Sequence, residues 1–257
     1  MGLEWPILRD EAVALVSTAV QQGVTMRVVG SAGIRLHCAG PTARMDELGR
    51  AAKDIDLVVP KQDRKAMRRF LEDRGYVADR QLLVSMEGRR YSFAHPDTSV
   101  ELDVFVERLE FNHTIEVKGR LDVHDVTVPL EELLLGKLQI VDLKRNDYID
   151  LAVLLSTHDV AMTGGSTENV SAERVSLLLA KDWGFHHTVT RNLDRLRSAM
   201  GTEVDLGAQG NELVRRRADT LTSAIDEAPK SMGWRVRAGI GERVQWWQDV
   251  DDREDSY

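Results

Sequence analysis

Apolar residues recur with two different periods along the chain, and the period changes near residue 129. Before that point, short apolar runs of the kind found in strands alternate with segments of helical spacing. After it, almost every segment repeats its apolar residues every three or four positions, as an amphipathic helix does. The pattern predicts an α/β (α+β) N-terminal domain with a mixed sheet over residues 1–129. An all-α helical bundle is predicted over residues 130–257.

The N-terminal half divides into helices and strands of ordinary length. The clearest strand covers residues 100–106, where apolar residues alternate with Glu101 and Asp103. Two short β runs, residues 82–86 and 90–93, predict a hairpin. The other segments are helices at residues 7–21, 32–38 and 61–74, strands at residues 26–29 and 54–59, and a weaker β region at residues 114–128.

The C-terminal half is predicted to be helical from its first residue. Pro129 favours a helix start, because proline fits the first turn, where its missing N–H costs nothing. Leu130, Leu134 and Leu138 then form one apolar stripe, which a second helix around residues 148–155 continues. Later helices are predicted at residues 168–181, 183–200, 211–227 and 238–249.

Three carboxylates are placed where they can meet. Asp54 and Asp56 flank one residue at the start of a predicted strand, so both side chains point to the same side of the sheet. Asp103 lies on another predicted strand, whose opposite face is apolar. If the two strands are neighbours, the carboxylates converge, and carboxylate oxygens are the ligands that Mg²⁺ takes. The simpler alternative is that Asp54 caps a turn while the others pair with basic neighbours such as Lys53.

A second motif precedes these carboxylates. The first predicted strand ends at Gly30 and Ser31, and the chain then turns into a helix. Glycine permits close backbone approach, and a helix N-terminus offers unpaired N–H groups to a phosphate. The two motifs together predict amides and a hydroxyl for a triphosphate, with carboxylates for the metal ions that bridge it. The alternative is an ordinary turn in which Ser31 is the helix N-cap.

In this order, the motifs resemble the nucleotidyltransferase superfamily, the DNA polymerase β-like group. The shared pattern is Gly-Ser after the first strand, an acidic-hydrophobic-acidic strand, and a third acidic residue on a later strand. Within the superfamily, the chain is most similar to the AbiEii-type toxins and related aminoglycoside-type nucleotidyltransferases. That similarity covers residues 26–155 and rests on residues 33–37, 135–138 and 144–151. Relative to this group, residues 40–53 look like an insertion, and Val29 stands where a glycine is commoner.

The resemblance implies a role for each residue of the two motifs. Asp54 and Asp56 would hold two Mg²⁺ (or Mn²⁺) ions. Asp103 would complete one metal site and assist removal of the proton from the acceptor hydroxyl. Gly30 and Ser31 would bind the β- and γ-phosphates of the NTP donor.

Further nucleotide-binding residues are expected in the helical half. Lys137 would act as a point charge on the triphosphate. Asp147 and Asp150 lie three residues apart and share a helix face, so they would orient Lys137 or Lys144, or contact the nucleotide. The alternatives are a solvent-exposed lysine, and surface ion pairs of the two carboxylates with Lys144 and Arg145.

The implied reaction moves a nucleoside monophosphate from an NTP to an acceptor hydroxyl and releases pyrophosphate. The acceptor is open between an RNA such as tRNA, a small molecule and a protein. Basic residues slightly favour a polyanion: Arg64, Lys65 and Arg68, with Arg89 and Arg90. An AbiEii-like protein also implies a cognate antitoxin. Two other functions fit parts of the pattern: a glycosyltransferase that uses Asp-x-Asp for a nucleotide sugar, and a non-catalytic nucleotide-binding module.

Composition adds limits on class and location. The 257 residues carry a formal charge of −8, which argues against a general nucleic-acid coat. Residues 242–257 hold six acidic and two basic residues, so this acidic tail carries about half of the net charge. A single cysteine, Cys38, excludes an internal disulfide. No apolar run approaches the roughly 20 residues of a membrane span, and the N-terminus lacks a signal pattern. We therefore expect a cytoplasmic protein without a membrane partner.

Overall fold

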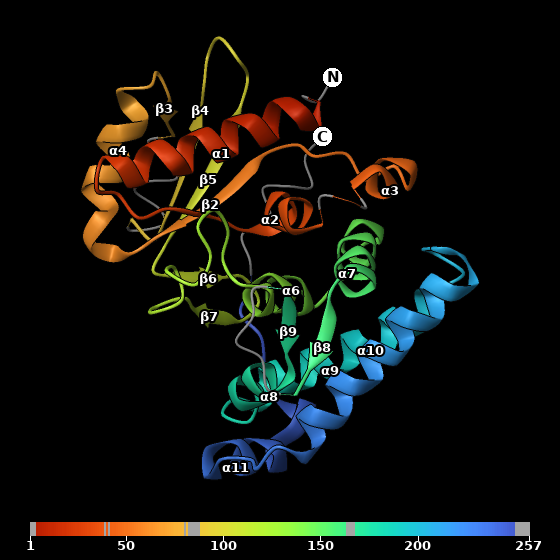
Figure 1. Cartoon of the computed structure of the whole chain (residues 1–257). Helices are drawn as coiled ribbons and strands as arrows, with labels where there is room; N and C mark the ends of the chain where they lie inside the picture. Colours follow the sequence, from red (N-terminus) through yellow and green to blue (C-terminus); the bar gives the residue numbers. More distant parts are fainter. Residues whose placement is uncertain are drawn as a thin grey trace. The chain divides into compact units, whose positions relative to one another are not determined.

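The computed structural model of the chain divides into two compact units (Figure 1). The first comprises Met1–Leu109 and Ile115–Leu133, and the second comprises Glu110–Thr114 and Leu134–Tyr257. The residues that the structure describes are 4–38, 40, 42–79, 81, 88–162 and 168–249.

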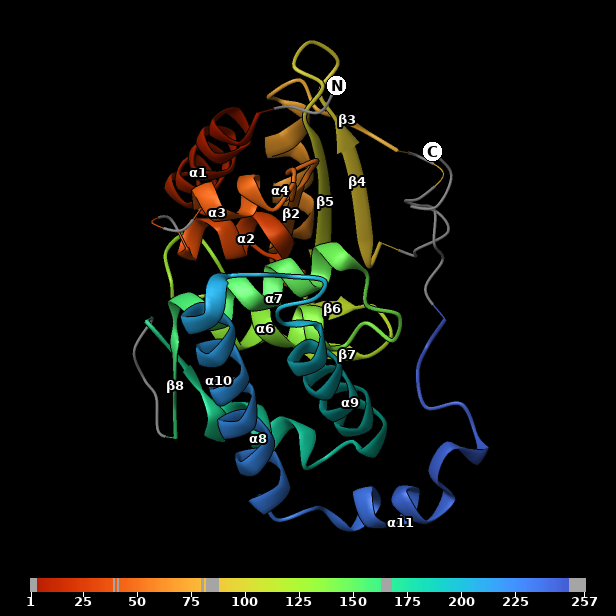
Figure 2. The same cartoon turned by 90° about the vertical axis from the view of Figure 1, so that its right-hand side faces the viewer.

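The first unit is built on a five-stranded sheet in the order β1-β2-β5-β4-β3 (Figures 1 and 2). Its central pair, β2 and β5, is parallel, whereas every other neighbouring pair is antiparallel. The predicted mixed sheet is therefore confirmed. In chain order, the strands are β1 (Arg27–Val28), β2 (Ile55–Val59), β3 (Val77–Ala78), β4 (Arg90–Ala94) and β5 (Glu101–Val106).

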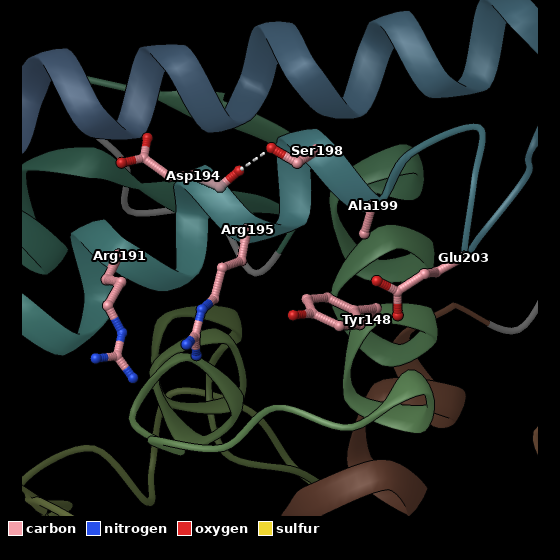
Figure 3. A pocket seen from close by; sticks show the side chains of 7 residues that line it. All are labelled: Tyr148, Arg191, Asp194, Arg195, Ser198, Ala199 and Glu203. Carbon is pink, nitrogen blue, oxygen red and sulfur yellow. Dashed lines mark hydrogen bonds between the residues drawn. The ribbon is translucent and has the colours of Figure 1, made fainter.

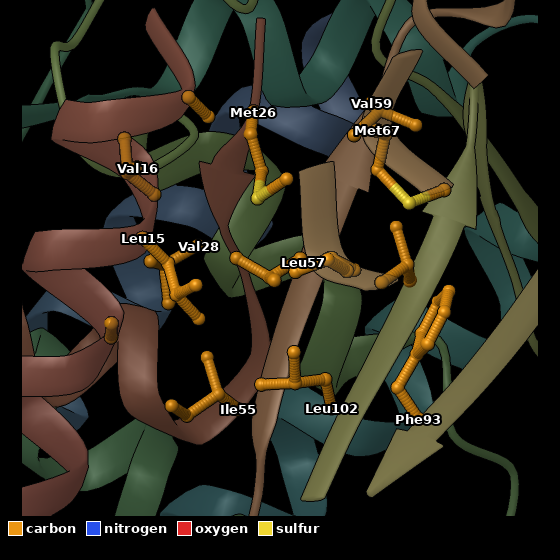
Figure 4. Packing of buried hydrophobic residues seen from close by; sticks show 14 of the residues in the cluster. Leu15, Val16, Met26, Val28, Ile55, Leu57, Val59, Met67, Phe93 and Leu102 are labelled. Atoms are coloured by element: carbon orange, nitrogen blue, oxygen red, sulfur yellow. The ribbon is translucent and has the colours of Figure 1, made fainter. Parts of the chain in front are cut away.

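The core of the first unit lies between one face of this sheet and the helices α1 and α4. Ile55, Leu57 and Val59 of β2 lie opposite apolar residues of β5 in register and are fully buried. Leu15 and Met67, from the two helices, are in the same apolar cluster (Figure 4). The period-2 pattern of β2 and β5 thus buries one face, and it leaves the alternate residues on the other. The helices of this unit are α1 (Trp5–Gln21), α2 (Gly30–His37), α3 (Thr42–Glu47) and α4 (Arg64–Glu72), with the 3₁₀ turn η1 (Lys61–Asp63) before α4.

One prediction in the first unit needs correction, and another extends beyond the described residues. The polar stretch of residues 40–53, which looks like an insertion, is predicted to be a loop, but it contains the helix α3. Residues 82–86, the first strand of the predicted hairpin, lie outside the described residues. The other strand of that hairpin is β4, which pairs with β3 and β5. The weaker β region at residues 114–128 contains the strand β7 (Thr114–Glu116), which pairs with β6 (Arg108–Glu110).

The second unit consists mainly of helices. The longest of them, α10, packs against α7, α8 and α9, and Figure 2 shows α9 and α10 side by side. No helix within the described ranges combines the length and apolar character that crossing a bilayer requires. The helix α6 (Leu130–Leu138) crosses the boundary between the two units at Leu133. The other helices are α7 (Arg145–Thr157), α8 (Ala172–Leu179), α9 (Trp183–Ala199), α10 (Gly207–Glu227) and α11 (Met232–Ile240), followed by the 3₁₀ turn η2 (Gly241–Arg243).

The expectation of an all-α second half is wrong in one respect. Two strands, β8 (Asp159–Ala161) and β9 (Asn169–Ser171), form a parallel pair. Each has three residues, which is too short to show a period of two. The helix predicted at residues 238–249 is α11, which begins earlier because the Ser231 side chain accepts a hydrogen bond from the Trp234 N–H as N-cap. It ends at Gly241, which has a φ of +61°.

Candidate metal centre

The sheet brings the three predicted carboxylates together. In the parallel pair of β2 and β5, Asp56 lies opposite Asp103. Both belong to the face opposite the apolar core formed with α1 and α4, and Asp54 directly precedes β2 on the same side. One oxygen of each carboxylate lies within 4.8 Å of the others, and all three residues are partly buried. The predicted convergence of Asp54, Asp56 and Asp103 is confirmed.

The donor set fits a hard divalent cation. Three carboxylates supply only oxygen ligands, which are the ligands of Mg²⁺ and Mn²⁺. Like charges this close repel one another, so a cation between them lowers the electrostatic free energy of the site. The cluster can therefore hold a metal ion.

Gly30 lies against this cluster and has room for no side chain. Its φ is +63°, in the left-handed region that glycine tolerates. A Cβ atom there would lie 2.1 Å from Oδ2 of Asp56. The Val29 N–H donates a hydrogen bond of 2.9 Å to the Asp56 carbonyl, which fixes the end of β1 to β2. A glycine at this position thus lets the first turn of α2 approach the Asp56 carboxylate.

Ser31 presents a buried hydroxyl beside this turn. Its Oγ is shielded from solvent and has no hydrogen-bond partner among the described residues. The N-cap of α2 is Val29, without a side-chain cap, so the alternative of Ser31 as N-cap is wrong. A buried hydroxyl without a partner costs free energy. The first turn of α2 also carries N–H groups that the helix itself does not bond. Together these groups suit an anionic ligand.

Arg90 is a residue of the site that the sequence interpretation missed. Its Nη2 lies 2.5 Å from Oδ2 of Asp103, in a partly buried ion pair. Its guanidinium also lies over the ring of Phe105, 5.1 Å from the centroid. The sequence interpretation grouped Arg90 with the basic residues that favour a polyanion, whereas the structure pairs it with a carboxylate of the cluster. The signal lay in the pairing of β4 with β5, because Ser92 lies opposite Asp103 and Arg90 is two residues away on the same face.

Lys137 and its predicted carboxylate partners meet in the second unit. Its Nζ lies 3.0 Å from Oδ1 of Asp147 and 3.0 Å from Oδ2 of Asp150. Asp150 is completely buried, and only 15% of the Lys137 side chain is exposed, so this is not a solvent-exposed lysine. Asp147 also accepts a hydrogen bond from the Lys144 backbone N–H through its second oxygen. Both carboxylates thus hold the Lys137 ammonium. This geometry agrees with the alternative in which Asp147 and Asp150 orient Lys137.

Comparison with known proteins leaves the family open. No family model and no curated protein matches the chain. Among solved structures, the chain is similar to an antigenic nucleotidyltransferase-like protein from Paracoccidioides brasiliensis. The two share 14% sequence identity over 90% of this chain and 97% of that one, with a TM-score of 0.45. A likeness this low supports no conclusion about activity, so the function has to be inferred from the residues of the site.

Proposed function

We propose that the chain is a metal-dependent nucleotidyltransferase, which transfers a nucleoside monophosphate from an NTP to an acceptor hydroxyl. One observation carries the proposal. Three carboxylates converge beside a Gly-Ser turn in which Gly30 leaves room for Asp56. The hydroxyl of Ser31 in that turn is buried without a partner among the described residues. Such a site combines ligands for a divalent cation with donors for the phosphates that the cation bridges.

The proposed reaction is an in-line displacement at the α-phosphorus. The acceptor oxygen forms a bond to that phosphorus, the bond to the bridging oxygen of the β-phosphate breaks, and pyrophosphate leaves. Asp103 takes the proton of the acceptor hydroxyl. Metal ions held by Asp54, Asp56 and Asp103 would neutralise charge on the attacking and leaving oxygens. The first turn of α2 and the Ser31 hydroxyl bind the β- and γ-phosphates.

The second unit supplies a further cation in this proposal. The Lys137 ammonium is held by Asp147 and Asp150 at 3.0 Å each, so its position is fixed before a ligand arrives. It serves as a point charge for the triphosphate. Because the ion pairs already restrict its rotamers, little side-chain entropy is lost when a phosphate binds.

Within the superfamily, we propose the group of AbiEii-type toxins and aminoglycoside-type nucleotidyltransferases, with a cognate antitoxin as partner. For the acceptor, the exposed residue Lys65 and its neighbour Arg64 on α4 favour a polyanion such as RNA. Arg68 contributes less to such a surface, because it pairs with Glu72 at 2.7 Å on the same helix.

The test of this proposal is a transfer assay with the Asp56→Asn variant. The protein is incubated with each α-labelled NTP, with Mg²⁺ or Mn²⁺, and with a pool of RNA and small hydroxylated acceptors. We expect label in one acceptor fraction with the wild type. The variant should lose transfer by on the order of 10³-fold, because a catalytic metal supplies several kcal/mol.

The matched control is Glu101→Gln, an exposed residue two positions before Asp103 on the same strand. It removes one negative charge, as Asp56→Asn does, but lies outside the carboxylate cluster, so transfer should persist. Full activity in Asp56→Asn would contradict the assignment of the site. Transfer that requires a nucleotide sugar instead of an NTP would favour a glycosyltransferase.

A further inference from the structure

The second unit contains a pocket that the proposed reaction does not use. It has a volume of about 340 Å³ and lies beside α9, opposite α7 (Figure 3). This volume is within the range of small-molecule sites, roughly 300–1,000 Å³. The residues that line it are Tyr148, Arg191, Asp194, Arg195, Ser198, Ala199 and Glu203.

Two arginines in this pocket are held close together. Arg191 and Arg195 lie one turn apart on α9, and their side chains extend in the same direction (Figure 3). Both donate hydrogen bonds to the carbonyl oxygen of Val141, at 3.2 Å from Arg191 and 3.0 Å from Arg195. The two positively charged guanidinium groups are therefore held next to the same carbonyl oxygen, although like charges repel one another.

Neither arginine has its charge matched within the described chain. No carboxylate of the described residues forms an ion pair with Arg191 or Arg195. Asp194, between them in sequence, is ion-paired with Arg197 instead. The Nε of Arg191 is buried without a hydrogen-bond partner in this part of the chain. Each guanidinium carries five N–H donors, so several remain for an anion.

Tyr148 and Glu203 add a hydrogen-bond donor and an acceptor to the pocket. The hydroxyl end of Tyr148 on α7 is turned toward Arg195 (Figure 3). Burial, and then the charge of Glu203, raise the pKa of this phenol, which keeps the hydroxyl protonated as a donor. The carboxylate of Glu203 lines the other side of the Tyr148 ring (Figure 3). An ionised carboxylate only accepts hydrogen bonds, so it suits hydroxyl or amino groups of a ligand.

We propose that this pocket binds a phosphate ester of a sugar, such as a nucleotide unit. Arg191 and Arg195 bind the phosphate from α9, and Tyr148 donates to it from α7. Donors from two directions match a tetrahedral phosphate better than a planar carboxylate, which one arginine can bind through two hydrogen bonds. Glu203 accepts hydrogen bonds from the sugar hydroxyls. The proposal is independent of the metal centre in the first unit.

The test measures binding to the full chain by calorimetry in the presence of EDTA, which separates it from any metal-dependent nucleotide binding. The probes are inorganic phosphate, ribose 5-phosphate and ribose. We expect ribose 5-phosphate to bind more tightly than phosphate, and ribose not to bind. Arg191→Met and Arg195→Met should each weaken both phosphates by about tenfold or more, because each removes charge-assisted hydrogen bonds.

The matched control is Arg197→Met, on the same helix and with the same change of charge. Arg197 pairs with Asp194 and Asp219 and does not line the pocket, so phosphate affinity should be retained. Equal losses in Arg195→Met and Arg197→Met would overturn the proposal, as would the absence of phosphate binding. Tyr148→Phe keeps the ring and removes one donor, so it provides a second test if an arginine variant fails to fold.

Glu203→Gln should change the affinities for inorganic phosphate and ribose 5-phosphate by different amounts. Removing a negative charge near an anion should strengthen the binding of inorganic phosphate. The additional affinity of ribose 5-phosphate over phosphate should shrink, because the charged acceptor for the hydroxyls is lost. An unchanged ratio of the two affinities would contradict the role of Glu203.

AMP and a short 5′-phosphorylated RNA then distinguish the source of the phosphate ester. Tighter binding of the RNA indicates the end of a strand, and equal binding indicates a free nucleotide.

Discussion

Gly30 lies directly beside the Asp56 carboxylate. A methyl group added at residue 30 therefore tests whether Asp56 binds a metal ion. In Gly30→Ala, the new Cβ would lie 2.1 Å from Oδ2 of Asp56, and the carboxylate would have to rotate away. We expect the affinity for Mn²⁺ to fall by about 10- to 100-fold, as it does when the support of a metal ligand is changed. Calorimetric titration with Mn²⁺ measures this loss.

The effect of the methyl group can be separated from backbone strain. Gly23 has a φ of +74°, close to the +63° of Gly30, but no atom lies within 4 Å of a Cβ built there. Backbone strain should therefore lower the free energy of unfolding of both Gly23→Ala and Gly30→Ala by about 1–2 kcal/mol, and the contact with Asp56 adds a further loss in Gly30→Ala alone. Only Gly30→Ala should lose metal affinity. A loss of metal affinity in both variants would mean that strain, and not contact with Asp56, is responsible.

The ion pair of Arg90 with Asp103 leads us to expect that this arginine competes with a metal ion for the carboxylate. Its guanidinium binds Oδ2 of Asp103 at 2.5 Å and adds a positive charge beside the carboxylate cluster. A cation that enters the cluster is repelled by this charge and has to displace Arg90 from that oxygen. We expect Arg90→Met to bind Mn²⁺ about tenfold more tightly, which corresponds to roughly 1.4 kcal/mol. Electron paramagnetic resonance of free Mn²⁺ measures the affinity.

Arg89→Met is the control for this measurement. It changes the net charge equally, but Arg89 is exposed and lies outside the Arg90–Asp103 pair. Its Mn²⁺ affinity should stay near that of the wild type. Weaker metal binding in Arg90→Met would show that the arginine supports the cluster and does not compete with the cation.

Among the elements, the sequence predicted best those that repeat a pattern over several residues. The first four residues of β5 and the first three of β2 alternate between buried apolar residues and acidic ones, which indicates where Asp56 and Asp103 point. The strands β8 and β9, with three residues each, have no such repeat. The prediction paired residues 90–93 only with the segment before them, whereas β4 also pairs with β5, the next strand along the chain. For that reason the ion pair of Arg90 was not predicted.

His113 makes the stability of the second unit depend on pH. It is buried, stacks on Phe185 of α9 and shares a hydrogen bond of 2.8 Å with Thr188 of the same helix. Burial lowers its pKa from 6.5 to about 4. The unfolded chain therefore takes up a proton at higher pH than the folded chain does. Stability is complete above pH 6.5 and is lost as the pH falls from 6.5 toward 4.

The size of this loss can be measured with His113→Gln. At pH 5 the depressed pKa costs the wild type about 2 kcal/mol relative to pH 7.5. Urea unfolding at both pH values should show that the wild type loses this much more stability than the variant. His186, whose pKa burial also lowers to about 4, adds a loss that both proteins share. Equal pH dependence in the two proteins would mean that His113 does not remain neutral in the folded state.

At the scale of the whole molecule, the sequence predicted the residues of the candidate site, but it did not predict the acceptor on which the site would act. The order of Gly30-Ser31, Asp54-x-Asp56 and Asp103 predicted one cluster on the condition that the two strands are neighbours, which the pairing of β2 with β5 meets. The pocket that contains Arg191 and Arg195 has no recognisable motif in the sequence, because it forms only where α7 and α9 pack in the second unit. The identity of an acceptor depends on surfaces of this kind, so a sequence pattern does not name it.

The carboxylate cluster is proposed to direct transfer of the nucleotidyl group. The most direct measurement follows an NTP labelled either at the α- or at the γ-phosphorus, in parallel reactions of the wild type with Mg²⁺ and the acceptor pool. We predict that the α-label moves to the acceptor while the γ-label appears in pyrophosphate, because the bond between the α-phosphorus and the bridging oxygen breaks. A γ-label on the acceptor, or release of inorganic phosphate alone, would contradict nucleotidyl transfer.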